Sequence, residues 1–120
     1  MIHKYDILCP SCRTKLNDGT KLTLKTKRES GEEGLIHLST TIGNYSYTHE
    51  PAVIFDIGEL VTFSCPKCYE NLNSKDFENY ALLKMKVDEN IEFEILFSRK
   101  AGIQKTYLVT EDGIETYSGT

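Results

Sequence analysis

The chain has 120 residues, of which 39% are hydrophobic and 10% aromatic, and its formal net charge is −4. A length in this range is typical of one domain, and the apolar content excludes a chain that is disordered throughout. The acidic balance disfavours a general nucleic-acid binder, and no apolar run approaches the roughly 20 residues that span a bilayer. We therefore expect a single domain, residues 1–120, with no membrane association.

The first residues and the cysteines together predict a compartment. Met1 to Asp6 lack the apolar stretch of a secretory signal, so a cytoplasmic protein is expected. Thiols stay reduced in that compartment. Four cysteines arranged in two close pairs are therefore better explained by metal binding than by disulfides.

Two short segments of the chain resemble each other. Residues 8–17 and 64–73 align with an offset of 56 and share two cysteines, a proline, a leucine and an asparagine, and no further self-similarity extends from them. Two cysteines separated by two residues can supply adjacent corners of a metal site from one tight turn, whose φ the intervening proline sets. We place the two metal knuckles within residues 1–20 and 60–76.

The two pairs complete one four-cysteine site, formed by Cys9, Cys12, Cys65 and Cys68. Four thiolates about 2.3 Å from one ion are typical of structural zinc sites and leave no open position for water or substrate. We expect Zn²⁺, with iron as the alternative, and no enzymatic activity. The 52 residues between Cys12 and Cys65 exceed the usual spacing of about 15 to 20, which indicates an insertion.

The insertion, residues 21–59, predicts a β-meander. Apolar residues alternate over residues 22–26 and 36–42, which is the period of half-buried strands. Turn signals occur at Asn17-Asp18-Gly19, at residues 31–34 and at Gly43-Asn44. The chain then returns to the second knuckle through residues 52–57 and 60–63.

The last part of the chain, residues 77–120, predicts an antiparallel sheet of three or four strands. Before it, polar residues 71–76 predict the cap of a short helix over about residues 75–80. Alternating apolar residues predict a strand pair at 81–87 and 91–97, and Asp112-Gly113 is a hairpin signal between 106–110 and 114–117.

The two Cys-Pro-x-Cys pairs, each followed by leucine four residues after its second cysteine, resemble the zinc ribbons and, more distantly, rubredoxin-like folds. The resemblance implies a knuckle-and-hairpin scaffold in which the four cysteines hold one ion, but it implies no single activity. In rubredoxins glycine commonly follows the second cysteine, whereas Arg13 and Tyr69 occupy these places, which favours zinc. The expected fold is mainly β, with zinc-ribbon-like four-cysteine knuckles, an inserted meander and a C-terminal antiparallel sheet.

Three functions are open at this point. A complete thiolate set favours a noncatalytic binding or adaptor protein that has a protein partner. The second is a rubredoxin-like electron-transfer or thiol-redox protein. A redox dithiol at Cys65 and Cys68 is disfavoured because the following chain is a poor helix start and shows no βαβ unit. The third is an RNA- or DNA-binding zinc ribbon.

The nucleic-acid hypothesis depends on the basic first part of the chain, since residues 1–28 carry seven Lys or Arg against two acids. The candidate nucleic-acid or partner surface consists of Arg13, Lys15, Lys21, Lys25, Lys27 and Arg28. The alternative is a solvated strand face that protects a sheet edge from unwanted pairing, and the acidic total favours it. His3, His37 and His49 are interpreted as surface histidines, with His37 facing solvent, rather than as replacements for a cysteine ligand.

Overall fold

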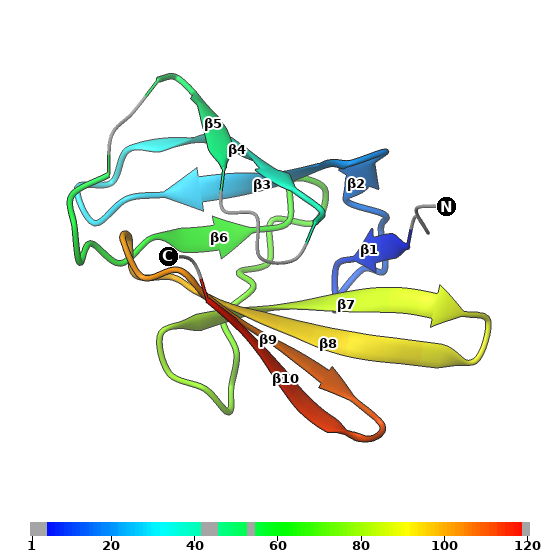
Figure 1. Ribbon diagram of the computed structural model, residues 1–120. Coiled ribbons are helices and arrows are strands. Elements are labelled where there is room, and N and C mark those ends of the chain that lie inside the picture. The colour runs from blue at the N-terminus through cyan, green and yellow to red at the C-terminus, as the bar shows by residue number, and fades with distance from the viewer. Residues whose placement is uncertain (1–4, 42–45, 53–54, 119–120) are drawn as a thin grey trace.

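The structure is a computed structural model that describes residues 5–41, 46–52 and 55–118. Within these residues the protein is all β, with ten strands in two five-stranded antiparallel sheets and no helix. The two sheets form the two layers seen in Figure 1. No membrane-spanning helix is found among the described residues.

The first sheet contains the predicted meander, which is confirmed. Its strands in sheet order are β2 (Asn17–Asp18), β3 (Lys21–Lys27), β4 (Glu33–Ser39) and β5 (Tyr47–Glu50), and β6 (Thr62–Ser64) also pairs with β3. β2 pairs with the beginning of β3 and β6 with its end, on the edge opposite β4. The returning chain therefore completes the edge that β2 leaves open.

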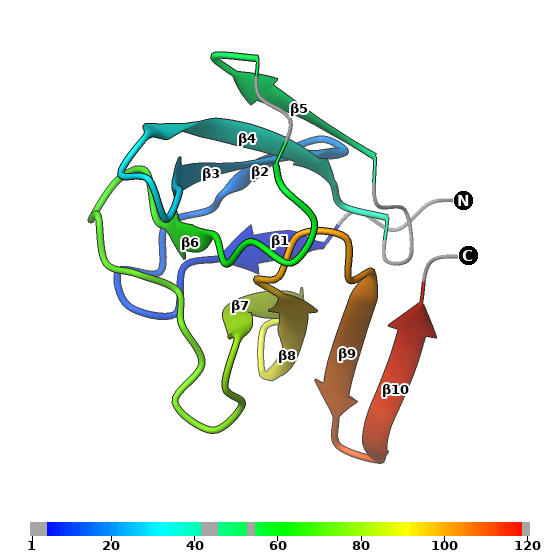
Figure 2. The same ribbon diagram turned by 90° about the vertical axis from the view of Figure 1, so that its left-hand side faces the viewer.

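The second sheet has the strand order β1 (Asp6–Leu8), β7 (Tyr80–Asp88), β8 (Ile91–Ser98), β9 (Lys105–Thr110) and β10 (Gly113–Ser118). The strand pairs β7/β8 and β9/β10 confirm the two predicted hairpins. Figure 2 shows β9 and β10 side by side at the outer edge of the sheet. The sequence did not predict that β1 joins this sheet, because its pairing with β7 connects two distant segments of the chain and has no local pattern.

The predicted helix near residues 75–80 is wrong. Ser74 Oγ accepts hydrogen bonds from the amides of Asp76 and Phe77 at 3.2 and 3.1 Å. The amide of Tyr80 then donates to the carbonyl of Phe77 at 3.2 Å, and Asn79 has a positive φ of 67°. The serine hydroxyl therefore caps a single turn, but the chain leaves this turn at the left-handed Asn79 and enters β7 at Tyr80.

The turn predicted at residues 31–34 is shorter than expected, because Gly34 lies inside β4. A Cβ atom at Gly34 would lie 2.5 Å from the carbonyl oxygen of Glu50 in β5. Glycine within a strand often marks such a close approach of two backbones. The turn predicted at Gly43-Asn44 lies outside the described residues.

The core fills the space between the two sheets. Every second residue is buried in β3 and in β7 up to Met85, which matches the predicted alternation. The buried cluster draws on both sheets and includes Leu24, Ile36, Phe63, Leu83 and Ile95 together with Cys9 and Cys65. Two of the four cysteines are therefore part of the hydrophobic core.

The two halves of the chain each have a strand, a cysteine turn and further strands in the same order. The first strand of each half pairs with the sheet of the other half. β1 precedes the first cysteine pair but pairs with β7, whereas β6 precedes the second pair but pairs with β3. The registers correspond, since Leu8 lies opposite Lys84 as Ser64 lies opposite Lys25. Each cysteine pair therefore lies where the chain passes from one sheet to the other.

Candidate metal centre

Each cysteine pair lies in a tight turn, which we call the first cysteine turn (residues 9–14) and the second cysteine turn (residues 65–70). In the first turn the amide of Cys9 donates to the carbonyl of Thr14 at 3.0 Å, and the amide of Arg13 donates to the carbonyl of Cys9 at 3.0 Å. The second turn has the two equivalent hydrogen bonds at 3.0 and 2.9 Å. The short sequence repeat is therefore a repeat of backbone geometry.

The residue after the second cysteine of each pair has a left-handed backbone. The φ angle is 66° at Arg13 and 64° at Tyr69, in a region that glycine enters freely and other residues disfavour. The turn therefore forms even though neither position holds glycine. The presence of Arg13 and Tyr69 in place of glycine no longer discriminates between zinc and iron.

The four sulfur atoms converge from the two turns and lie within 4.8 Å of one another. Cys9 Sγ is 3.7 Å from Cys68 Sγ, and Cys12 Sγ is 3.7 Å from Cys65 Sγ. Bonds of about 2.3 Å in a tetrahedron place neighbouring sulfurs about 3.8 Å apart, whereas a disulfide requires about 2.05 Å. The cluster therefore has the size of a single tetrahedral metal site, and its cysteines are free thiols.

Backbone amides point at the two buried sulfurs. Cys9 and Cys65 are both 0% exposed. Cys9 Sγ accepts hydrogen bonds from two amides of its own turn at 3.4 and 3.5 Å, and Cys65 Sγ accepts from two amides of its turn at 3.3 and 3.4 Å. Such donors stabilise the negative charge of thiolates that ligate a metal.

The thiols differ in their electrostatic environment. Burial raises the pKa of the Cys9 and Cys65 thiols. Cys12 is exposed, and its hydrogen bonds with Thr14 lower the pKa of its thiol to about 6. Because a metal binds thiolates, binding releases protons chiefly from Cys9, Cys65 and Cys68, whose thiol pKa values are raised, and less from Cys12, whose thiol pKa is lowered. Thr14 was not predicted from the sequence, where its only signal is a hydroxyl two residues after a cysteine.

The four-cysteine cluster is placed so that a bound ion would hold distant parts of the chain together. Leu16 and Leu72, the leucines shared by the sequence repeat, follow the two turns into the core and are 7% and 2% exposed. The carbonyl of Leu16 accepts from β3 and that of Leu72 accepts from β7. An ion shared by both turns would therefore link the two sheets and close a long loop, which removes conformational entropy from the unfolded chain.

Two of the three histidines, His37 and His49, are described by the structure, and neither belongs to the four-cysteine cluster; His3 lies outside the described residues. His37 Nδ1 is 3.0 Å from Thr23 Oγ1, and His37 Nε2 is 2.5 Å from Glu50 Oε2. The His37 side chain is only 13% exposed, so its expected solvent-facing position is wrong. The contact with His37 lowers the pKa of the Glu50 carboxyl. His49 Nε2 is 2.6 Å from Thr26 Oγ1.

The six candidate surface cations do not form one open patch. Lys21, Lys25 and Lys27 share one face of β3 as predicted, but Arg13 reaches across to β8. Four of the six cations form ion pairs, namely Arg13 with Glu92, Lys15 with Asp6, Lys25 with Glu33 and Arg28 with Glu59. Most of these acids could not be found from the sequence, because tertiary pairing brings them to the cations.

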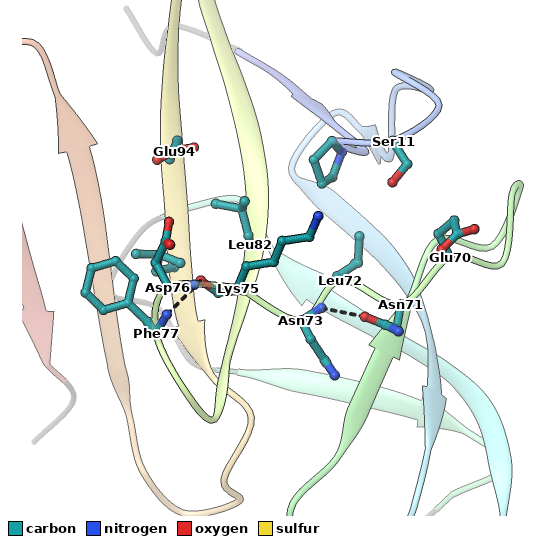
Figure 3. A pocket seen from close by; sticks show the side chains of 13 residues that line it. Ser11, Glu70, Asn71, Leu72, Asn73, Lys75, Asp76, Phe77, Leu82 and Glu94 are labelled. Carbon is teal, nitrogen blue, oxygen red and sulfur yellow. Dashed lines mark hydrogen bonds between the residues drawn. The ribbon is translucent and has the colours of Figure 1, made fainter.

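A hollow of about 500 Å³ opens beside the first cysteine turn (Figure 3). Lys75, Asp76 and Glu94 line it, so its charges have both signs, and Glu94 Oε2 is 2.8 Å from Lys84 Nζ. Figure 3 shows the amide of Asn73 donating to the side chain of Asn71. Within the described residues no buried side-chain polar atom lacks a partner. The hollow therefore presents solvated polar groups rather than a defined binding site.

Fold and site together define an all-β protein with a four-cysteine cluster arranged for a metal ion. Comparison with protein-family models, with curated proteins and with solved structures finds no match for this chain. Since a fold alone does not specify an activity, the chemistry of the cluster carries the evidence for function.

Proposed function

We propose that the four cysteines hold one structural Zn²⁺ ion in a zinc-ribbon-like core, and that the protein is a noncatalytic binding or adaptor protein. The observation that carries this proposal is the sulfur-to-sulfur distance of 3.7 Å across the two turns. Four thiolates fill the coordination of zinc, which is typical of structural and not catalytic sites. The free cysteines further support the cytoplasm as the compartment.

Iron with an electron-transfer function is the second candidate. The backbone of the cysteine turns supports iron as well as zinc, because the left-handed residue after each pair agrees with the rubredoxin-like resemblance. Tetrahedral sites of four thiolates accept either metal. Nucleic-acid binding has less support, since four of the six candidate cations already pair with acids.

Metal analysis and a visible absorption spectrum of protein purified under reducing conditions test the proposal. We expect one zinc per chain, a colourless solution and a large loss of thermal stability when a chelator removes the ion. Red colour with one iron per chain would replace zinc with the electron-transfer candidate. A reduced protein that is fully folded without metal would contradict both.

A further inference from the structure

An apolar cleft of about 310 Å³ lies between the first sheet and the connection from β8 to β9, residues 99–104. Its floor is formed by Ile36, Val61 and Phe63, which are 4%, 3% and 7% exposed. Phe63 belongs to β6, and Cys65 follows that strand directly. The cleft and the four-cysteine cluster are therefore joined through β6, with Cys65 of the cluster directly after this strand.

Large apolar side chains stand exposed around this cleft. Ile57 is 93% exposed, Ile103 47% and Tyr47 44%. Single exposed hydrophobic residues are normal on a protein surface, but several that gather around one concave region mark an interaction site. Phe55 adds a further aromatic ring, whose centroid is 6.0 Å from that of Tyr47.

The wall of the cleft is held by backbone hydrogen bonds. The amide of Val61 donates to the carbonyl of Arg99, the amide of Ala101 to that of Glu59, and the amide of Gly58 to that of Ala101, each at 2.8 Å. Residues 58–61 and 99–101 therefore form a short two-stranded ribbon. A preformed wall lowers the entropic cost of binding a ligand.

Arg99 supplies a fixed charge in this wall. Its Nε donates to the carbonyl of Val61 at 3.0 Å, and its Nη2 donates to Thr62 Oγ1 at 3.2 Å. Among the described residues no carboxylate pairs with Arg99, and its Nη1 has no partner. Burial lowers the pKa of the Arg99 guanidinium, so the charge is partly desolvated without a compensating acid.

Arg28 provides an internal comparison, because it lies over the ring of Phe55 beside the same cleft. Its guanidinium makes two hydrogen bonds to the Glu59 carboxylate at 3.0 and 2.9 Å. The charged side chains that line the cleft are Arg99 and Lys100, both positive. On a protein with a net charge of −4, this is a local positive site in apolar surroundings.

We propose that this cleft binds an extended segment of a partner protein that carries one bulky aliphatic or aromatic side chain beside a carboxylate. The apolar side chain packs on Val61 and Phe63, and the carboxylate accepts hydrogen bonds from Arg99, as arginine and carboxylates do in paired geometry. The proposal rests on the proposed binding or adaptor function and specifies the chemistry of the partner.

Fluorescence anisotropy with a labelled nonapeptide tests the proposal on the metal-loaded protein. The probe has one central phenylalanine flanked by glutamates. The two reference peptides replace the phenylalanine with serine or the glutamates with lysine. We expect saturable binding of the probe alone, weakened by salt, and amide NMR shifts concentrated in residues 58–61 and 99–103.

Two variants and one control locate the site. Arg99→Gln keeps a hydrogen-bond donor but removes the charge, and it should weaken binding about tenfold or more, as loss of a desolvated charge pair does. Ile57→Ser removes an exposed side chain, so it leaves the fold intact and should also weaken binding. Lys75→Gln removes one positive charge in the hollow of Figure 3 and should leave the affinity unchanged.

The proposal would be overturned if all three peptides bound equally or if the probe did not bind. It would also be overturned if neither Arg99→Gln nor Ile57→Ser weakened binding. Binding of decanoate in the cleft without binding of the probe would also overturn it, because the ligand would then be a lipid carboxylate. Zinc is measured in the same samples. If the protein is folded and zinc-loaded but does not bind the probe, only the cleft proposal is contradicted. If the protein is folded without metal, the proposed metal centre is contradicted.

Discussion

The first and second cysteine turns share a backbone and differ in how each is anchored. Both have the same hydrogen bonds and a left-handed residue after the second cysteine. At that position Arg13 forms an ion pair with Glu92 of β8, whereas Tyr69 lies against Lys25 of β3, whose Nζ is 4.9 Å from the ring centroid. The shared features are those that a tetrahedral thiolate site requires, and the differing ones attach each turn to a different sheet.

Away from the four-cysteine cluster the two halves diverge further. The first half ends in the short strand β5 and a loop that lines one side of the apolar cleft, whereas the second half lines the other side with residues 98–104 and continues through β9 and β10. The repeated part is therefore the metal-binding core. The parts that differ are free to serve a partner, and the variants below test how far the equivalence of the two turns extends.

The largest effect is expected for the equivalent buried cysteines. Cys9→Ser and Cys65→Ser should each abolish stoichiometric metal binding and lower the melting temperature strongly, because structural zinc contributes about 10 kcal/mol or more in small zinc domains. Metal content and thermal melts measure this. The two losses should match, since both sulfurs are 0% exposed and both accept two amides. A variant that retains both metal and stability would show that its turn is dispensable.

The equivalent leucines come next. Leu16→Ala and Leu72→Ala should each destabilise the metal-loaded protein by about 2–5 kcal/mol in urea unfolding, as buried leucines do. The cost should be larger for Leu72, which is 2% exposed against 7% for Leu16. Ile57→Ala, at 93% exposed, is the matched control and should change stability by less than about 0.5 kcal/mol. The reverse order of the two leucines would contradict this burial argument.

A smaller effect is expected where the first half meets the cleft. Arg28 lowers the pKa of the Glu59 carboxyl from 4.5 to about 2 through hydrogen bonds. A carboxyl whose pKa is lower in the folded chain stabilises the fold above its unfolded pKa and loses this contribution as the pH falls towards the folded value.

Glu59→Gln should therefore melt below the wild type at pH 7, and the gap should narrow below pH 4.5. Both proteins are compared in the same metal state at each pH, so that loss of the ion in acid does not enter the difference. A gap that stays constant down to pH 2 would contradict the assignment of the stabilisation to the ionised carboxylate.

The smallest effect concerns the left-handed positions. At Tyr69 and Arg13, glycine should be more stable than valine by about 1 kcal/mol, because an L side chain is strained at positive φ. Thermal melts of the four variants measure this difference. It should be similar at both positions, because the φ angles are 64° and 66° and neither variant keeps the native contacts of its site. Unequal differences would show that the two turns are not equivalent.

Much of the fold could be predicted because its signals are local. The alternation in β3, β7 and β8 follows from side chains that point to opposite faces of a strand, and Asp112-Gly113 predicts the β9/β10 hairpin. The helix near residues 75–80 was wrong because Asn79 has a positive φ and Tyr80 pairs with Ser98 of β8, a tertiary contact that ends the turn. The position of Gly34 inside a strand was not predicted, because glycine is required there by the close approach of the Glu50 carbonyl in the neighbouring strand.

The sequence by itself determined that four cysteines act as two equivalent pairs, because ligand type and spacing are properties of a short segment. Only the tertiary structure decided that each pair crosses between the sheets, that acids neutralise most of the predicted cations, and that Arg99 stands without an acid partner among the described residues. These features depend on contacts between segments that are distant in the sequence. Such contacts form cooperatively with the whole fold, so they produce no periodic pattern in the sequence.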